Sequence, residues 1–191
     1  MLSAVNFGWE DAMRVYSFTA AGLAAAVLVA ASATAQVTTD NVAGITNLRQ
    51  VKSTVACAGA TTPESMRAVK EMGFVAVVNL RQASENGANV EAERVVAEAA
   101  GLTYIHIPMN GAAPDPAVVD RFVAAARNPA NNPMFVHCAT GNRAASVWLI
   151  RRVLVDGWTV DKASEEAAAL GLTSAPLKQF ALDYVHTNGG K

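Results

Sequence analysis

The sequence predicts an α/β fold with a small, mostly parallel sheet of four to five strands flanked by helices. Short apolar runs of strand length alternate along the chain with longer segments that end at glycines. The run Phe-Val-Ala-Val-Val-Asn-Leu at 74–80 is almost continuously apolar, as expected of a strand buried on both faces. Strands that alternate with helices favour a parallel sheet that helices cover on both sides.

Four strands and six helices can be placed along the chain. The strands are expected at 51–58, 74–80, 102–108 and 134–136, and the helices at about 62–72, 90–100, 115–127, 144–157, 160–170 and 176–186. The first helix begins at Thr62-Pro63-Glu64, which supplies a hydroxyl cap, an early proline and an acid in the first turn. Gly73, Gly101 and Gly171 follow three of these helices as stop signals. Glu165 and Glu166 are expected on the solvated face of their helix.

Residues 1–35 are predicted to be a secretory signal peptide, and the acids that precede Met13 suggest Met13 as its true start. An apolar core is followed by Ala-Thr-Ala at 33–35, which fits the small-x-small cleavage pattern before Gln36. The mature chain would be exported, to the periplasm of a Gram-negative cell. It would consist of a lead-in segment at 36–50 and a catalytic domain at 51–191. The alternative is an uncleaved membrane anchor, because the apolar run is nearly long enough to span a bilayer.

Charge and composition exclude several classes of partner. The formal net charge is −1, and no basic stripe with interleaved aromatics is present, so nucleic acid is not an expected partner. The three histidines, His106, His137 and His186, lack metal-ligand spacing, so neither a metal nor a cofactor is expected. The two cysteines, Cys57 and Cys138, would be able to pair in an oxidising compartment. The favoured interpretation of Cys57 is a small buried core residue at a strand end.

The stretch 134–149 combines a strand, a loop and a helix in an arrangement suited to anion chemistry. The loop Cys-Ala-Thr-Gly-Asn-Arg at 138–143 leads into the helix, so several backbone N–H groups would point at one spot. The helix dipole adds positive potential there, which favours the thiolate of Cys138. Arg143 could offer a planar pair of donors to a bound oxyanion. Nucleophile, anion cradle and cation therefore fall within six residues.

This stretch resembles the signature loop of the cysteine-dependent tyrosine and dual-specificity phosphatases, in which His-Cys is followed by a glycine-containing loop, an arginine and a helix. The chain as a whole is most similar to the bacterial family named for beta-lactamase hydrolase-like, phosphatase-like domains. Gly59 with the Thr-Thr-Pro-Glu helix start, Asn-Leu-Arg at 79–81 and the segment 104–108 extend the resemblance over about 55–171. It implies a protein-tyrosine-phosphatase-like fold.

One departure separates the loop from the phosphatase pattern. Four residues lie between Cys138 and Arg143, where those phosphatases have five, and Ala144 occupies the usual arginine position. A loop of this length looks like that of the rhodaneses, which carry sulfur as a cysteine persulfide.

The resemblance implies a role for each residue of the site. Cys138 would be the nucleophile, Arg143 would hold the oxyanion, and His137 would bond the backbone around the loop. Arg81 would either help to bind anions or form a structural salt bridge. The anion-binding loop would consist of Ala139, Thr140, Gly141, Asn142 and Ala144.

Two groups that such phosphatases use are missing at the expected positions. The general acid would lie on the loop 109–114, at Asn110 or Gly111, and neither is an acid. Asp115 is the only nearby carboxylate, and an aspartate before a proline is also a helix cap. The hydroxyl residue that usually follows the arginine is replaced by alanine, and Ser146 lies one turn too far along the helix to assume its role.

Three functions follow from these observations, and all of them involve a small anionic ligand. The first is a cysteine-dependent phosphatase that forms a phosphocysteine on Cys138, which the surrounding fold favours. The second is a rhodanese-like sulfurtransferase that carries a persulfide on Cys138, which the loop length favours. The third is a non-catalytic anion-binding module.

Overall fold

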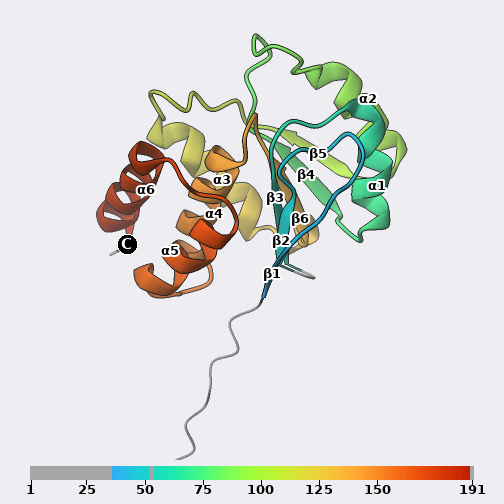
Figure 1. Cartoon of the computed structure of the whole chain (residues 1–191). Coiled ribbons are helices and arrows are strands. Elements are labelled where there is room, and N and C mark those ends of the chain that lie inside the picture. The colour runs from blue at the N-terminus through green and yellow to red at the C-terminus, as the bar shows by residue number, and fades with distance from the viewer. Residues whose placement is uncertain (1–35, 52–53, 190–191) are drawn as a thin grey trace, which may run out of the picture. The chain divides into compact units, whose positions relative to one another are not determined.

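The computed structural model describes residues 36–51 and 54–189, so the predicted signal peptide at 1–35 lies outside the described residues. A six-stranded sheet with the order β1-β2-β3-β6-β4-β5 organises this part of the chain (Figure 1). The strands are β1 (Val37–Thr39), β2 (Arg49–Val51), β3 (Val55–Ala58), β4 (Ala76–Asn79), β5 (Thr103–His106) and β6 (Met134–His137). The α/β class and the predominance of parallel pairing in the centre of the sheet are confirmed.

Eight helical segments connect and cover the strands. They are η1 (Pro63–Ser65), α1 (Met66–Glu71), α2 (Val90–Ala99), α3 (Pro116–Arg127), η2 (Pro129–Asn131), α4 (Asn142–Leu154), α5 (Val160–Ala169) and α6 (Ala175–Asn188). The α4 helix begins two residues earlier than predicted, so Arg143 lies in its first turn. Among the described residues, no helix is both long and apolar enough to cross a membrane.

The sheet is larger than predicted because the supposed lead-in segment belongs to it. Strands β3, β6, β4 and β5 are parallel, whereas β1, β2 and β3 pair antiparallel. The strand expected at 51–58 is shorter in the structure: Val51 is the last residue of β2, and the strand itself is β3 at Val55–Ala58. Thr54 N–H, just before β3, donates to the Val51 carbonyl over 3.1 Å. An edge strand such as β1 is half exposed, so it lacks the apolar run that identifies a central strand.

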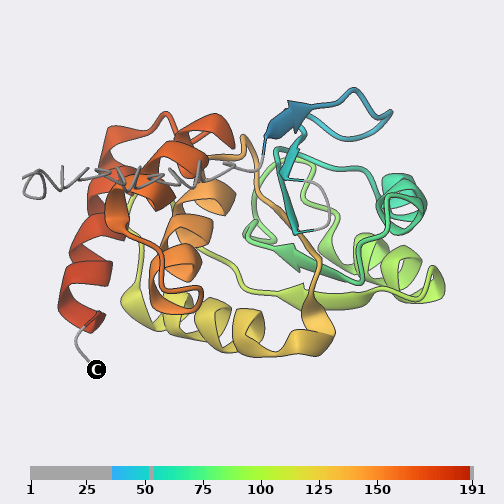
Figure 2. The ribbon, with the colours of Figure 1, turned by 90° about the horizontal axis from the view of Figure 1, so that it is seen from below.

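Helices cover the sheet on both faces, and each face has its own hydrophobic core (Figure 2). Alternate residues of β6 point to opposite cores, with Val136 in the core shared with α3, α4, α5 and α6 and Phe135 in the core shared with α1 and α2. Both cysteines lie on the Val136 face, and both are buried free thiols. Burial, together with the nearby Cys138, raises the pKa of Cys57 well above its ordinary value, as suits a core residue.

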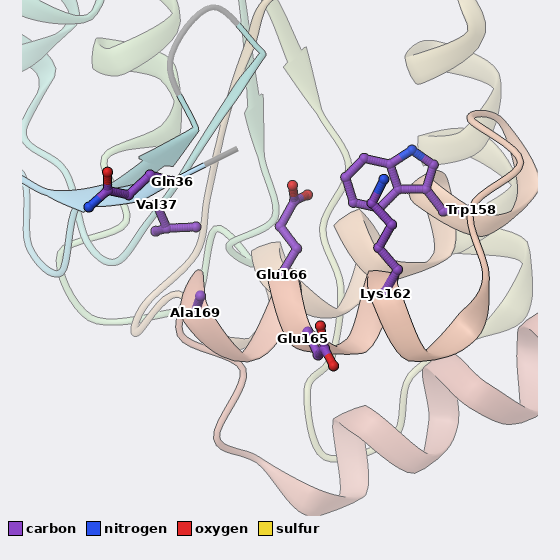
Figure 3. A pocket seen from close by; sticks show the side chains of 7 residues that line it. All are labelled: Gln36, Val37, Trp158, Lys162, Glu165, Glu166 and Ala169. Atoms are coloured by element: carbon purple, nitrogen blue, oxygen red, sulfur yellow. The ribbon is translucent and has the colours of Figure 1, made fainter. Parts of the chain in front are cut away.

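Glu166 is buried, and its predicted place on a solvated helix face is wrong. Its carboxylate accepts bonds from Trp148 Nε1 at 2.8 Å and from Arg152 Nε and Nη2 at 2.6 and 3.0 Å. The neighbouring Glu165 is exposed, as predicted. The two carboxylates leave α5 in different directions at a cavity of about 230 Å³ beside the start of β1 (Figure 3). Glu166 therefore joins α5 to α4 through a buried ion pair.

We expect Glu166→Gln to lower the free energy of unfolding by about 2 kcal/mol, because the buried Arg152 would lose the charge of Glu166 and keep only Asp156 as its carboxylate partner. Urea denaturation measures this loss. Glu165→Gln is the matched control on the next residue, and it should change stability by less than about 0.5 kcal/mol. Equal effects of the two substitutions would contradict the buried role of Glu166.

Candidate active site

The predicted nucleophile loop lies at the carboxyl end of the central strand β6, between β3 and β4. His137 pairs in register with Ala58 of β3 and with Asn79 of β4. Cys138 N–H then donates to the Ala58 carbonyl at 3.2 Å, which carries the pairing one residue past the strand. Ligands of parallel sheets bind at this edge, so the fold places Cys138 where a site is expected.

Gly59 allows the β3 segment to pass close to the nucleophile loop. Ala60 N–H donates to the Ala139 carbonyl at 3.1 Å, and Gly59 N–H donates to the Thr46 carbonyl at 2.7 Å. A Cβ atom on Gly59 would lie only 3.1 Å from the Thr46 carbonyl and 3.2 Å from the Ala139 carbonyl. Residue 59 must therefore lack a side chain for the loop to keep this position.

The loop and the first turn of α4 hold several backbone donors next to Cys138. Gly141 N–H donates to Cys138 Sγ at 3.1 Å. The N–H groups of Asn142, Arg143 and Ala144 form the first turn of α4, and none has an acceptor among the described residues. Gly141 itself has a φ of +98°, a left-handed conformation that favours glycine. Sulfur, unpaired amides and the positive end of a helix thus meet in one loop.

Arg143 is held by an acid that the sequence did not indicate. Its Nη1 and Nη2 bond the two oxygens of Glu85 at 2.6 and 2.8 Å, and Nη1 also donates to the carbonyls of Leu80 and Met109. The bond from Arg143 lowers the pKa of Glu85 to about 2. Burial lowers the pKa of Arg143, but the bond to Glu85 together with the charges of Cys138 and Glu85 outweighs it and raises that pKa. Nε–H and one Nη2–H of Arg143 have no oxygen acceptor in the described chain.

Arg81 shapes the loop that carries Glu85. Its guanidinium donates to the carbonyls of Asn86 and Gly87 at 2.6 and 2.9 Å, and its Nε lies 3.5 Å from the Glu85 carboxylate. Gln82 N–H donates to Glu85 Oε1 at 2.8 Å. Of the two predicted roles of Arg81, the structure therefore supports the structural one.

His137 contacts side chains, so the prediction that it bonds the backbone around the loop is wrong. Its Nε2 lies 3.3 Å from Glu93 Oε2, and its Nδ1 lies 3.3 Å from Thr61 Oγ1. The Nε2 contact is not aligned as a hydrogen bond. The buried Glu93 also accepts bonds from the Thr61 hydroxyl, from Asn79 Nδ2 at 2.6 Å and from the Tyr104 hydroxyl at 2.8 Å.

This buried network holds His137, the residue before the predicted nucleophile, in place. Burial raises the pKa of Glu93, but His137 and the hydroxyl donors outweigh it and keep that pKa below its ordinary value. Glu93 thus stays ionised beneath the loop. The sequence held one signal for it, because Glu93 lies four residues before the buried Ala97 and so shares the inner face of α2.

A cavity of about 430 Å³ opens beside the loop, and Ala139, Thr140 and Asn142 of the predicted anion-binding loop line it, whereas the fully buried Cys138 is not part of its lining. Its lining consists of Gln82, Glu85, Asn110, Gly111, Ala139, Thr140, Asn142, Arg143, Ser174 and Leu177. Among the described residues that line it, Glu85 is the only carboxylate. A pKa of about 2 keeps Glu85 ionised at neutral pH, so it is unsuited to donate a proton.

Two further candidate residues have structural partners. Asp115 is the N-cap of α3, where it accepts a bond from Ala117 N–H at 2.9 Å, and it does not line the cavity. The predicted capping interpretation of Asp115 is confirmed. The hydroxyl of Ser146 is buried and donates to the Arg143 carbonyl at 2.8 Å, inside α4.

This sheet, with a cysteine loop between its central strand and a helix, defines the class of protein-tyrosine-phosphatase-like domains. Within that class, the chain belongs to the family described as the beta-lactamase hydrolase-like protein, phosphatase-like domain, whose model matches residues 47–155. No curated protein matches the chain.

Three solved structures illustrate the likeness in fold. A DUF442 protein of Shewanella putrefaciens CN-32, named as a candidate phosphatase, has a TM-score of 0.62 at 21% identity and covers 79% of this chain and 98% of its own. A variant of P. aeruginosa TpbA in complex with pTyr has a TM-score of 0.56 at 16% identity, and the match covers 81% of this chain and 98% of the TpbA chain. The core catalytic domain of the S. cerevisiae PP-IP phosphatase SIW14, in complex with citrate, has a TM-score of 0.58 at 17% identity. This match covers 78% of this chain and 96% of the SIW14 chain.

The Glu85–Arg143 pair should make stability fall in acid. The pKa of Glu85 is lowered from 4.5 to about 2, so its stabilising effect is complete above the unfolded value and disappears as the pH falls through that interval. Above about pH 5, we expect the free energy of unfolding of wild type to exceed that of Glu85→Gln by about 2 kcal/mol. This difference should shrink towards about pH 2. Urea denaturation at several pH values measures it.

The exposed Glu165 supplies the control for this experiment, because Glu165→Gln should track wild type over the same pH range. A difference between wild type and Glu85→Gln that stayed constant from about pH 6 to about pH 2 would show that ionisation of Glu85 is not its source.

Proposed function

We propose that this protein is a phosphatase that hydrolyses small phosphate esters through a phosphocysteine on Cys138. The strongest support is that three groups lie within one loop and the helix turn that follows it. Within the part of the chain that the structure describes, these are the buried thiol of Cys138, the three first-turn amides of α4 without acceptors, and the guanidinium of Arg143, whose Nε–H has no oxygen acceptor. Membership in a phosphatase-like family agrees with it. The likeness to TpbA and SIW14 supports the fold on which the proposal rests.

In the proposed first step, the Cys138 thiolate attacks phosphorus and the bond from phosphorus to the ester oxygen breaks. The amides of Asn142 and Ala144 and the Nε edge of Arg143 would stabilise the negative charge of the transferring group. Water then attacks phosphorus, the sulfur–phosphorus bond breaks, and inorganic phosphate leaves with the thiolate restored. Glu85 would act by orienting Arg143, and it would not contact the substrate.

The proton balance restricts the substrates. The leaving oxygen needs a proton, and the described lining of the cavity offers no carboxylic acid that is protonated at neutral pH. Water must then supply that proton, so the proposed enzyme favours esters whose leaving group is stable as an anion. Activated aryl phosphates meet this condition.

The missing acid and the four-residue spacing also support a second candidate, a rhodanese-like sulfurtransferase. Here the Cys138 thiolate would attack the outer sulfur of thiosulfate, the sulfur–sulfur bond would break, and sulfite would leave. Cyanide would then take the outer sulfur of the persulfide as thiocyanate and restore the thiolate. No step of this cycle needs an acid.

Reduced wild-type protein should release phosphate from 4-nitrophenyl phosphate, and Cys138→Ser should lower the rate by about 1,000-fold or more, because the hydroxyl is a far weaker nucleophile. A parallel assay with thiosulfate and cyanide measures thiocyanate. Cys57→Ala is the matched control, since this second buried thiol lies outside the loop and should keep the activity. Thiocyanate without phosphate would replace the proposal by the sulfurtransferase, and neither product would favour the anion-binding module.

Asp115 allows the acid question to be tested separately. Asp115→Asn keeps a good helix cap and removes the acid, so we expect phosphatase activity and stability both to remain at the wild-type level. Asp115→Ala should lose about 1 kcal/mol of unfolding free energy and keep its activity. A large fall in kcat for Asp115→Asn with an unactivated alkyl phosphate would instead assign the proton donor to Asp115.

A further inference from the structure

A second, smaller cavity adjoins the proposed reaction cavity. It has a volume of about 220 Å³, and polar residues dominate its lining, among them Asn47, Arg49 and Thr173. Thr140 and Asn142 of the nucleophile loop line both cavities, so they form the wall between them. The two cavities therefore adjoin at the Cys138 loop.

Arg49 gives this second cavity its charge. The side chain is half buried, and its Nη1 donates to the Ala169 carbonyl at the end of α5 over 3.2 Å. Its Nε and Nη2 have no acceptor, and its guanidinium has no carboxylate partner, among the residues that the structure describes. In contrast, Arg81 and Arg143 both pair with Glu85, and Arg152 pairs with Glu166.

The walls of the second cavity are held in place from both sides. Asn47 has a φ of +49°, and its Nδ2 donates to the Thr140 carbonyl at 3.3 Å. Asn142 Oδ1 accepts bonds from Thr173 N–H at 2.8 Å and Ser174 N–H at 2.7 Å. These contacts tie the nucleophile loop to the segments before β2 and before α6, so the cavity is pre-formed.

The charges of the two cavities differ. In the reaction cavity the charge of Glu85 neutralises that of Arg143. In the described part of its lining, no further positive side chain remains to balance a second anionic group of a substrate. The second cavity has a cation with unused donors and no neutralising acid in its described lining. A guanidinium of this kind binds carboxylate or phosphate oxygens through paired N–H groups.

We propose that Arg49 forms a subsite for a second anionic group of the substrate, so that the preferred substrates are phosphate esters that also carry a carboxylate. This inference rests on the proposed phosphatase function for its reaction, but the subsite itself can be measured by binding alone. The phosphoryl group would occupy the nucleophile loop, and the carboxylate would reach past Thr140 and Asn142 to Nε and Nη2 of Arg49.

Two aryl phosphates that differ in one carboxylate test the subsite in the full-length reduced protein. 4-Nitrophenyl phosphate lacks the second anion, and 3-carboxy-4-nitrophenyl phosphate carries it. We expect Arg49→Gln to lower the ratio of kcat/KM for the carboxylated ester to kcat/KM for 4-nitrophenyl phosphate about tenfold. The change should be a higher KM for the carboxylated ester at unchanged kcat, because a contact far from the reacting atoms stabilises ground and transition states alike. Arg49→Lys keeps the charge and should recover part of the ratio.

The exposed Arg67 of α1 provides the matched control, and Arg67→Gln should leave the ratio unchanged. The rate with 4-nitrophenyl phosphate reports that each variant is folded. An unchanged ratio in Arg49→Gln would overturn the subsite while the phosphatase function stood.

If wild type hydrolysed neither ester, the proposed function would fail and calorimetric titration with the same two compounds would decide the subsite. Tighter binding of the carboxylated ester that is lost in Arg49→Gln would establish the subsite without the reaction. Equal binding of both esters, or binding of neither, would overturn it.

Discussion

The bidentate pair between Arg143 and Glu85 is the interaction on which the site depends. It fastens the first turn of α4 to the loop after β4, and the bonds from Arg143 to the Leu80 and Met109 carbonyls bring the loop after β5 to the same place. Three carboxyl ends of parallel strands are thus held around one guanidinium. The pair also keeps Glu85 ionised and leaves the reaction cavity without a net charge.

The chemistry proposed for the loop follows from that charge balance. The free edge of Arg143 and the amides of α4 suit a single transferring anion, while the ionised Glu85 is no proton donor. Under the proposed function, such a site would take phosphate esters with stable leaving groups, and the same features would also permit sulfur transfer, which needs no acid. The cation beyond the loop, Arg49, is the place where a second anionic group of a substrate would find a counter-charge.

Buried acids account for what the sequence did not reveal. Glu93 beneath His137 and Glu166 beside Arg152 both lie on helices whose polar residues suggest a solvated face. The helical period shows which residues share one face of a helix. It does not show whether the element packed against that face carries a cationic side chain. Glu85 lies in an irregular loop, where no period exists at all. The partners Asn79, Arg152 and Arg143 of these acids lie 14 to 58 residues away along the chain, so folding brings them together.

The sequence by itself determined the α/β class, the central strands and the position of the Cys138 loop, because apolar runs, caps and the His-Cys pair are local properties. It also indicated the family through the order of its motifs, although the four-residue spacing to Arg143 departs from the phosphatase pattern. It also identified both interpretations of Arg81 and the capping role of Asp115. The tertiary structure decided the size of the sheet, since the weakly apolar β1 and β2 become strands through pairing with β3. It likewise decided that Arg143 contacts Glu85 and His137 contacts Glu93, because the packing of distant elements determines which acid lies beside a buried side chain.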